Sequence, residues 1–191
     1  MEFKAKRLQR GDALITAIIA ALIFHVIGYV IIEWTRIARE NRAYAAQTTG
    51  LRAMHSALMQ YARANQASFK SGKEIMYVND QYAPSVSELT SLGFLSLAGP
   101  EITAPWGGTF GTKLKLETGG AITGYVYLNG NIKNSVGAVD RVRACNIAKT
   151  LGDIGLCTPP SNAAFLGNLM VQVANPSSSP AAIGAYVAIP P

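Results

Sequence analysis

Residues 13–32 read ALITAIIAALIFHVIGYVII, an apolar run of 20 residues that contains no Asp, Glu, Lys or Arg. As an α-helix this run would measure about 30 Å, the thickness of the hydrocarbon core of a bilayer. A helix buried in a soluble core usually keeps a polar face, and this run has none. A cleavable secretory signal usually has an apolar region of only about 7–15 residues. The stretch therefore predicts a membrane-spanning helix.

A short polar leader precedes the apolar run. It holds one acidic residue and four basic ones, which are Glu2, Lys4, Lys6, Arg7 and Arg10. Short segments rich in lysine and arginine tend to stay in the cytoplasm. We therefore expect a single-pass topology, with residues 1–11 in the cytoplasm and the chain after Glu33 on the far side of the membrane.

The basic character of the chain comes partly from this leader. The 191 residues carry 17 basic and 11 acidic side chains, a formal net charge of +6. Removal of the leader's four basic residues and one acidic residue leaves 13 and 10, a net charge of +3. Nucleic-acid binding normally needs a clustered basic face on the folded domain, and none is evident after residue 73. We expect no nucleic-acid partner.

Helical periodicity continues beyond the apolar run. Residues at seven-residue intervals, with others between them at steps of three or four, form one stripe: Trp34, Ile37, Asn41, Tyr44, Thr48, Leu51, Leu58 and Tyr61. This spacing predicts one long helix over residues 12–71, with 12–33 in the membrane and Ser71-Gly72 as its end. We expect the part of the stripe from Leu51 to Tyr61 to pack on the chain's own head.

Residues 72–191 are enough for one hydrophobic core, and their pattern predicts an α+β head. Ser85-Val86-Ser87-Glu88 fits a capping box and predicts a short helix to Leu92. Lys113–Glu117 and Ala121–Leu128, separated by Thr118-Gly119-Gly120, predict a β-hairpin. Helical spacing over residues 138–151 predicts a second helix, and residues 169–174 and 185–189 predict closing strands.

Two cysteines lie near the C-terminal end of the head, Cys145 and Cys157. An even number of cysteines in an exported domain favours a disulfide, which here would close a small loop. Two unpaired buried thiols are the alternative. A zinc site would need His25 and His55, and both lie on the N-terminal helix, so we expect no metal site.

Two segments of the chain resemble type IV pilins, and most closely the type IVb pilins that include PilV-type minor pilins. The first is Arg10-Gly11 followed by residues 12–16, DALIT, and the apolar helix. The second is residues 89–95, LTSLGFL, with residues 104–110, APWGGTF, which are similar to the helix, turn and strand entry of those pilins. The resemblance implies the type IV pilin fold, in which a long N-terminal helix packs on an antiparallel sheet.

The resemblance also implies a processing step. In that family a prepilin peptidase cuts after the glycine and methylates the new N-terminus, which implies cleavage between Gly11 and Asp12 and N-methylation of Asp12. The product would be a pilus subunit, and we expect a minor pilin. It would pass from the bacterial inner membrane into an extracellular pilus used for adhesion or conjugation. The implied partners are other pilin subunits, the prepilin peptidase and the inner-membrane assembly machinery, with a cell-surface receptor as a further candidate.

The implied assembly surface lies on the N-terminal helix and comprises Asp12, Thr16, His25, Trp34, Ile37 and Tyr44. This chain departs from the family at the fifth mature position, where Thr16 replaces the usual glutamate. That glutamate offsets a buried terminal amine, and an unpaired buried charge costs several kcal/mol. One hypothesis is that Asp12 supplies the carboxylate; another is that the subunit sits at the fibre tip. A third is that the Thr16 hydroxyl only bonds back to its own helix.

The sequence gives no support for catalysis. One of the two histidines lies in the apolar run, which leaves little for a histidine-based triad. The pairs Gly107-Gly108 and Gly119-Gly120 lack the Lys-Ser/Thr that completes a phosphate-binding loop. We therefore expect no enzyme and no cofactor. Two other functions stay open: an uncleaved single-pass protein with an external binding or sensing domain, and a type II secretion pseudopilin.

Overall fold

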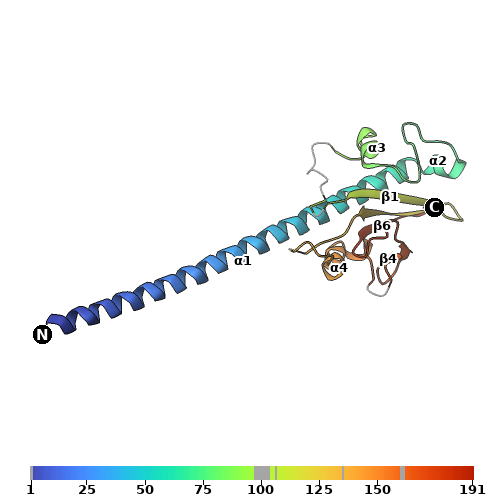
Figure 1. Ribbon diagram of the computed structural model, residues 1–191. Helices are drawn as coiled ribbons and strands as arrows, with labels where there is room; N and C mark the ends of the chain where they lie inside the picture. Colours follow the sequence, from blue (N-terminus) through green and yellow to red (C-terminus); the bar gives the residue numbers. More distant parts are fainter. Residues whose placement is uncertain (1, 97–103, 106, 135, 160–161) are drawn as a thin grey trace. The chain divides into compact units, whose positions relative to one another are not determined.

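The computed structural model describes residues 2–96, 104–105, 107–134, 136–159 and 162–191, with side-chain surroundings from residue 13 onward. The chain divides into two units, Met1–Asn41 and Arg42–Pro191, and each is described by itself. The first unit is helical throughout its described length. The second unit contains the sheet, the shorter helices and the end of the long helix (Figure 1).

Helix α1 runs from Glu2 to Ala64, so the segment expected to be a leader is part of the same helix. The predicted helix to residue 71 is interrupted by a turn at Asn65, where the side-chain Nδ2 donates to the carbonyl oxygen of Tyr61 at 2.9 Å. Asparagine side chains compete in this way with the regular helical hydrogen bonds. Helix α2, Gln66–Ser71, follows the turn and ends at Gly72, which has the left-handed conformation that favours glycine.

The predicted capping box is confirmed at helix α3, Val86–Ser91. The Ser85 hydroxyl accepts a hydrogen bond from the Glu88 amide at 3.2 Å, and a Glu88 carboxylate oxygen accepts one from the Ser85 amide at 2.7 Å. The other carboxylate oxygen accepts from the Asn79 amide at 2.7 Å. Glu88 therefore fixes both the start of the helix and the loop that leads into it.

The described part of the chain contains one six-stranded antiparallel sheet with the order β1-β2-β6-β3-β4-β5. Its strands are β1 (Thr109–Leu116), β2 (Ile122–Asn129), β3 (Gly155–Cys157), β4 (Phe165–Gly167), β5 (Gln172–Ala174) and β6 (Ile183–Ile189). The predicted hairpin is confirmed as β1 and β2, and the last predicted strand is confirmed as part of β6. The α+β class is confirmed, and the resemblance-based fold remains a proposal.

One strand prediction is wrong in its first half. Leu169 and Met170 lie in the turn that leads into β5, which begins only at Gln172. The Asn168 side chain forms this turn, because its Oδ1 accepts hydrogen bonds from the amides of Met170 and Val171, each at 2.8 Å. The apolar pair is therefore not part of a buried strand.

The predicted helix over residues 138–151 is shorter in the structure, as helix α4, Arg141–Thr150. Asp140 caps it by accepting a hydrogen bond from the Arg143 amide at 2.9 Å. The helix ends at the C-cap residue Leu151, and a single turn of 3₁₀ helix, η1 (Gly152–Ile154), leads directly into β3.

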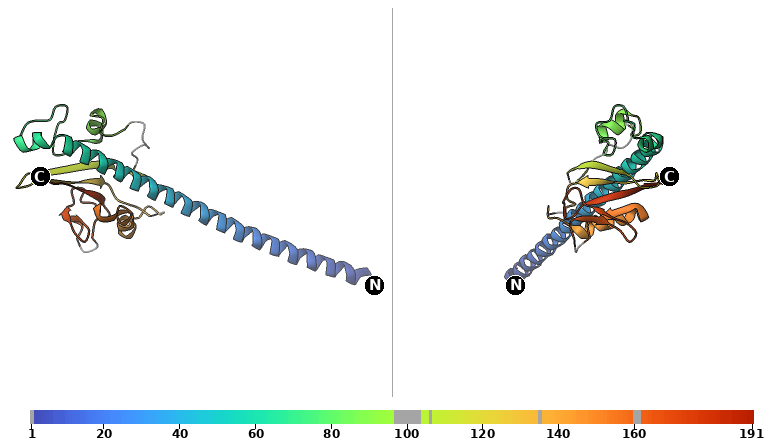
Figure 2. Two further views of the ribbon diagram at one scale, coloured as in Figure 1. Left: turned by 180° about the vertical axis from the view of Figure 1, so that it is seen from behind. Right: turned by 90° about the vertical axis from the view of Figure 1, so that its right-hand side faces the viewer.

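The main core lies between α1 and the inner face of the sheet (Figure 2). The predicted burial of the helix stripe is confirmed, since Leu51, Leu58 and Tyr61 are fully buried. Strand β2 alternates as expected for a sheet with one face inward, with Ile122, Val126 and Leu128 in this core.

A second, smaller core lies on the opposite face of the sheet, where β3, β4 and β5 curl over β2. It is built from Tyr125, Leu156, Leu166 and Ala182. The Tyr125 hydroxyl donates a hydrogen bond to the Ala174 carbonyl oxygen at 3.1 Å, which holds β5 against the outer face of β2. The burial of the Tyr125 ring explains why its pKa is raised.

Candidate anchoring and assembly surfaces

The N-terminal unit presents an apolar surface with no cover of its own. Its large apolar side chains are exposed, among them Leu14, Phe24 at 76 % and Ile32 at 68 %. Burial of each such side chain would contribute about 1.5–3 kcal/mol of stabilising free energy, which is lost while the side chain stays in water. Among the described residues, α1 is the one helix long and apolar enough to cross a membrane, and none of its apolar window is buried. This surface needs lipid or another protein around it.

The apolar surface ends sharply after Ile32. Glu33 and Arg36 form an ion pair at 2.5 Å, and the Thr35 hydroxyl donates to the Ile32 carbonyl oxygen at 2.8 Å. The Trp34 side chain is 75 % exposed at this boundary. Tryptophan favours the interface between hydrocarbon and headgroups, so a membrane boundary near residue 33 agrees with the sequence prediction.

The predicted assembly residues of this unit do not share one face. Thr16, His25 and Trp34 are exposed and nine residues apart. Nine residues are about two and a half helical turns, so His25 points to the side opposite Thr16 and Trp34. Ile37 is also exposed, one turn further on. A partner that contacts all of these residues must surround the helix, as lipid or several neighbouring helices would.

Gly11 and Asp12, the predicted cleavage and methylation sites, lie in the helical backbone of α1. The side chain of Asp12 lies outside the described part of the structure, as does Trp106 of the pilin-like segment 104–110. These site assignments therefore stay predictions.

Tyr44, the last predicted assembly residue, is held by the head. It is half-buried and packs against the main core. The Arg143 guanidinium lies 5.4 Å from the centre of its ring, a cation–π distance. Arg143 is itself positioned by an ion pair with Asp140, whose carboxylate lies 3.6 Å from the arginine Nε. Only part of the Tyr44 ring is thus exposed.

Polar contacts fix the last third of α1 on the head. Arg52 donates from Nη2 to the Thr150 carbonyl oxygen at 2.7 Å, and the hydroxyls of Thr48 and Thr150 lie 3.1 Å apart. On the other side of the helix, the buried Tyr61 hydroxyl donates to the Gln81 carbonyl oxygen at 3.2 Å. Burial raises the Tyr61 pKa, so this hydroxyl remains a donor.

His55 lies on the part of α1 that packs on the head. It is half-buried and forms a hydrogen bond with the backbone of Tyr186 in β6. Burial lowers its pKa more than this hydrogen bond raises it. The imidazole is therefore neutral at pH 7 and links the helix to the C-terminal strand.

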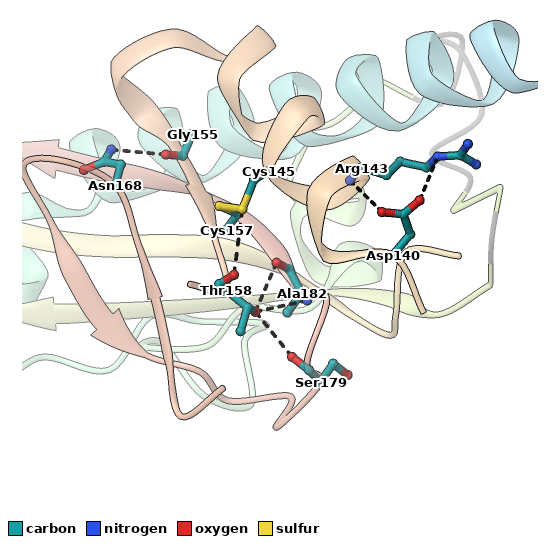
Figure 3. The surroundings of a disulfide bond; sticks show 9 residues. All are labelled: Asp140, Arg143, Cys145, Gly155, Cys157, Thr158, Asn168, Ser179 and Ala182. Atoms are coloured by element: carbon teal, nitrogen blue, oxygen red, sulfur yellow. Dashed lines mark hydrogen bonds and ion pairs between the residues drawn. A yellow bond between two sulfur atoms is a disulfide. The ribbon is translucent and has the colours of Figure 1, made fainter. Parts of the chain in front are cut away.

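The predicted disulfide between Cys145 and Cys157 is present and joins α4 to β3 (Figure 3). This finding excludes both unpaired thiols and a zinc site at these residues. The next residue, Thr158, is buried, and its hydroxyl accepts a hydrogen bond from the Ala182 amide at 3.1 Å. The disulfide and Thr158 together tie the short strand β3 to its neighbours. Among the described residues no three His, Cys, Asp or Glu side chains gather as a metal site.

An open groove of about 740 Å³ lies beside the disulfide, and the sequence analysis did not anticipate it. Its lining includes Ala148 and Lys149 of α4, Asp153 of η1, and the turn residues Leu169 and Met170. The signal in the sequence was the pair Gly167-Asn168, which is typical of a turn and places the following apolar pair outside a strand.

Comparison of the chain with protein-family models, with curated proteins and with solved structures finds no match in any of the three. The functional argument therefore depends on the chain's own surfaces.

Proposed function

We propose that this chain is a pilin-like subunit of the type IVb class, most similar to the minor pilins, with the type IV pilin fold. In this proposal a prepilin peptidase cuts after Gly11, and the freed helix enters a filament. One observation carries the proposal: a single helix is exposed and apolar over residues 13–32 and fully buried at Leu51, Leu58 and Tyr61. The C-terminal half of α1 packs in the core of the head, and the exposed N-terminal half is available for contact with partners.

A bundle of identical helices would bury the exposed apolar side chains of residues 13–32 as well as lipid does. Thr16 and Trp34 point to one side of α1 and His25 to the opposite side, so a subunit in such a bundle would contact neighbours on both sides of the helix. Lipid supplies only apolar contact, whereas neighbouring helices also supply hydrogen bonds for His25. This difference favours transfer of the helix from the inner membrane into an extracellular pilus.

The groove beside the disulfide favours one alternative. An external pocket of this size on a head joined to one membrane-spanning helix also suits an uncleaved anchored protein that binds a ligand. The two functions differ at the N-terminus, because only the pilin-like subunit loses residues 1–11.

The mass of the mature N-terminus tests the proposal. We expect a chain that begins at N-methylated Asp12 in sheared filaments from cells that express a matching prepilin peptidase. A Gly11→Val variant, whose side chain blocks the cleavage site, should keep Met1 and stay in the membrane fraction. An intact Met1 in the wild-type chain in the presence of the peptidase, with no chain in filaments, would support the anchored protein instead.

A further inference from the structure

We propose that the head binds a second copy of itself through the groove beside the Cys145–Cys157 disulfide. The contact does not depend on cleavage or on filament assembly, because every residue that makes it belongs to the unit Arg42–Pro191. It would therefore form in a membrane-anchored chain as well as between subunits of a pilus.

The first observation is an apolar protrusion at the rim of the groove. Leu169 is 105 % exposed and Met170 80 % exposed, which makes Leu169 the most exposed large apolar side chain in the described structure. Burial of a side chain of this kind contributes about 1.5–3 kcal/mol of stabilising free energy relative to exposure to water. Exposed apolar side chains beside a groove are typical of a protein contact site.

The second observation is that the protrusion is held in place. Asn168 forms the turn beneath it, and its Nδ2 donates to the carbonyl oxygen of Asp153 at 2.7 Å. The same Nδ2 donates to the carbonyl oxygen of Gly155 at 3.1 Å (Figure 3). The turn is thereby attached to the segment that forms the floor of the groove. A side chain presented on a fixed turn loses little conformational entropy on binding.

The third observation is the charge of the lining, which decides the occupant. Among the described residues that line the groove, one is basic, Lys149, and one is acidic, Asp153, and both are exposed. Neither forms an ion pair with another residue that the structure describes. A site for an anionic or a cationic ligand would carry an excess of one sign. This lining is neutral and complementary to itself.

A protrusion, a hollow, one cation and one anion on the same surface suit a two-fold contact between identical heads. Each copy would place Leu169 and Met170 in the groove of the other. Lys149 of each copy would face Asp153 of the other, so that the contact contains two ion pairs around one apolar centre. Charge pairs of this kind fix the orientation of a contact more than they add to its affinity.

Zero-length cross-linking of the full chain in membrane vesicles tests the contact. Vesicles are prepared from a mixture of ¹⁴N- and ¹⁵N-labelled chains, and a carbodiimide joins amines to carboxylates that touch. We expect a peptide pair in which Lys149 of one label is joined to Asp153 of the other. Absence of any mixed-label pair at these two residues would overturn the proposal, and so would a cross-link from Lys149 to a different protein.

Charge reversal in trans separates this contact from a structural role of the same residues. Lys149→Glu and Asp153→Lys chains, each alone, should give no mixed-label cross-link between positions 149 and 153, because two carboxylates or two amines then face each other and repel. A mixture of the two variants should restore the yield to within about twofold, since two amines now face two carboxylates. Equal yields in the mixture and in the single variants would contradict the contact.

A matched methionine pair tests the apolar centre. Met170→Asp should lower the cross-link yield about tenfold, whereas Met76→Asp, at a methionine that is 71 % exposed away from the groove, should not change it. Equal losses in both variants would overturn the proposal. The mature N-terminus is measured in the same samples, so failure of the head contact and failure of the proposed pilin-like processing are read separately.

Discussion

Arg52 of α1 donates a hydrogen bond to the carbonyl oxygen of Thr150, the last residue of α4, at 2.7 Å. The last carbonyl groups of a helix have no partner within the helix and carry partial negative charge. A guanidinium at this point both satisfies the carbonyl and complements the helix dipole. The contact joins α1 to α4 through two residues that are 98 positions apart in the sequence.

Substitution of this arginine should loosen α4 from α1. We expect Arg52→Ala to lower the free energy of unfolding by about 1 kcal/mol, because a charged hydrogen bond contributes roughly 1.5–3 kcal/mol when buried and less when exposed. Urea unfolding of the full chain in detergent, followed by near-UV circular dichroism, measures this. Arg63→Ala is the matched control, since Arg63 is exposed on the same helix. Equal effects of the two variants would argue against a specific role for the Thr150 contact.

Gly155 of β3 packs directly against the backbone of α4. A Cβ atom at this position would lie 1.9 Å from the carbonyl oxygen of Ala148, which is backbone and cannot rotate away. We expect Gly155→Ala to lower the free energy of unfolding by about 3 kcal/mol, because α4 and the sheet must separate to admit one methyl group.

Gly28→Ala is the control for this substitution, because a Cβ at Gly28 meets nothing within 4 Å. We expect it to leave the unfolding midpoint of the head unchanged. A Gly155→Ala chain as stable as the wild type would mean that α4 moves away from β3 at no cost, and the packing argument would be wrong.

The lowered pKa of His55 predicts that the folded chain loses stability in mild acid. Burial lowers its pKa below the usual 6.5 in the folded state. Above pH 6.5 the imidazole is neutral in both states, so its contribution is fully present. As the pH falls from 6.5 toward the lower folded pKa, the unfolded chain binds a proton that the folded chain does not, and the free energy of unfolding decreases.

A His55→Gln substitution should remove this dependence of the free energy of unfolding on pH. Its stability at pH 7 is expected to be lower, because the hydrogen bond with the Tyr186 backbone changes, but the fall between pH 6.5 and 5 should be smaller than in the wild type. The measurement is a series of urea midpoints across this range. His25→Gln is the control, since this residue belongs to the other unit. An unchanged slope in the His55 variant would show that its burial does not set the pH dependence.

The sequence predicted the local parts of the fold and missed the non-local ones. The spacing of Leu51, Leu58 and Tyr61, and the capping box at Ser85 and Glu88, are patterns within one element, and both are confirmed. Strands β3 and β4 have three residues each, too few to show alternation. Their existence depends on pairing with distant partners, such as Gly155 with Ala185, which no local pattern encodes.

Of the two functional surfaces, one could be predicted from the sequence and the other could not. The exposed apolar helix could be predicted because length and composition alone identify a helix that is able to cross a membrane. The groove could not, because it arises where α4, η1 and the turn at Asn168 meet in space. Apolarity was also misleading at Leu169 and Met170, where it marks two exposed side chains in a turn rather than a buried strand.

Within the proposed function, the last prediction concerns the roles of Asp12 and Thr16 in assembly. Cleavage after Gly11 would create a positive amine at Asp12, close to the point where α1 meets its neighbours. If the Asp12 carboxylate pairs with its own or an adjacent amine, Asp12→Ala leaves the amine uncompensated. The loss of such a buried partner costs about 3–5 kcal/mol, enough to block assembly. We therefore expect sheared filaments to contain no Asp12→Ala subunit, although the variant is still cleaved.

Thr16→Glu distinguishes this pairing from a position at the fibre tip. With Asp12 already paired, an added glutamate should leave the amount of incorporated subunit similar to that of the wild type, and it should restore assembly of the Asp12→Ala chain. At a tip, Thr16→Glu would instead move the subunit along the fibre, which immunogold labelling detects. Thr16→Val is the control for the hydroxyl alone. If filaments form equally with all of these variants, neither the pairing nor the tip position explains why threonine stands at this place.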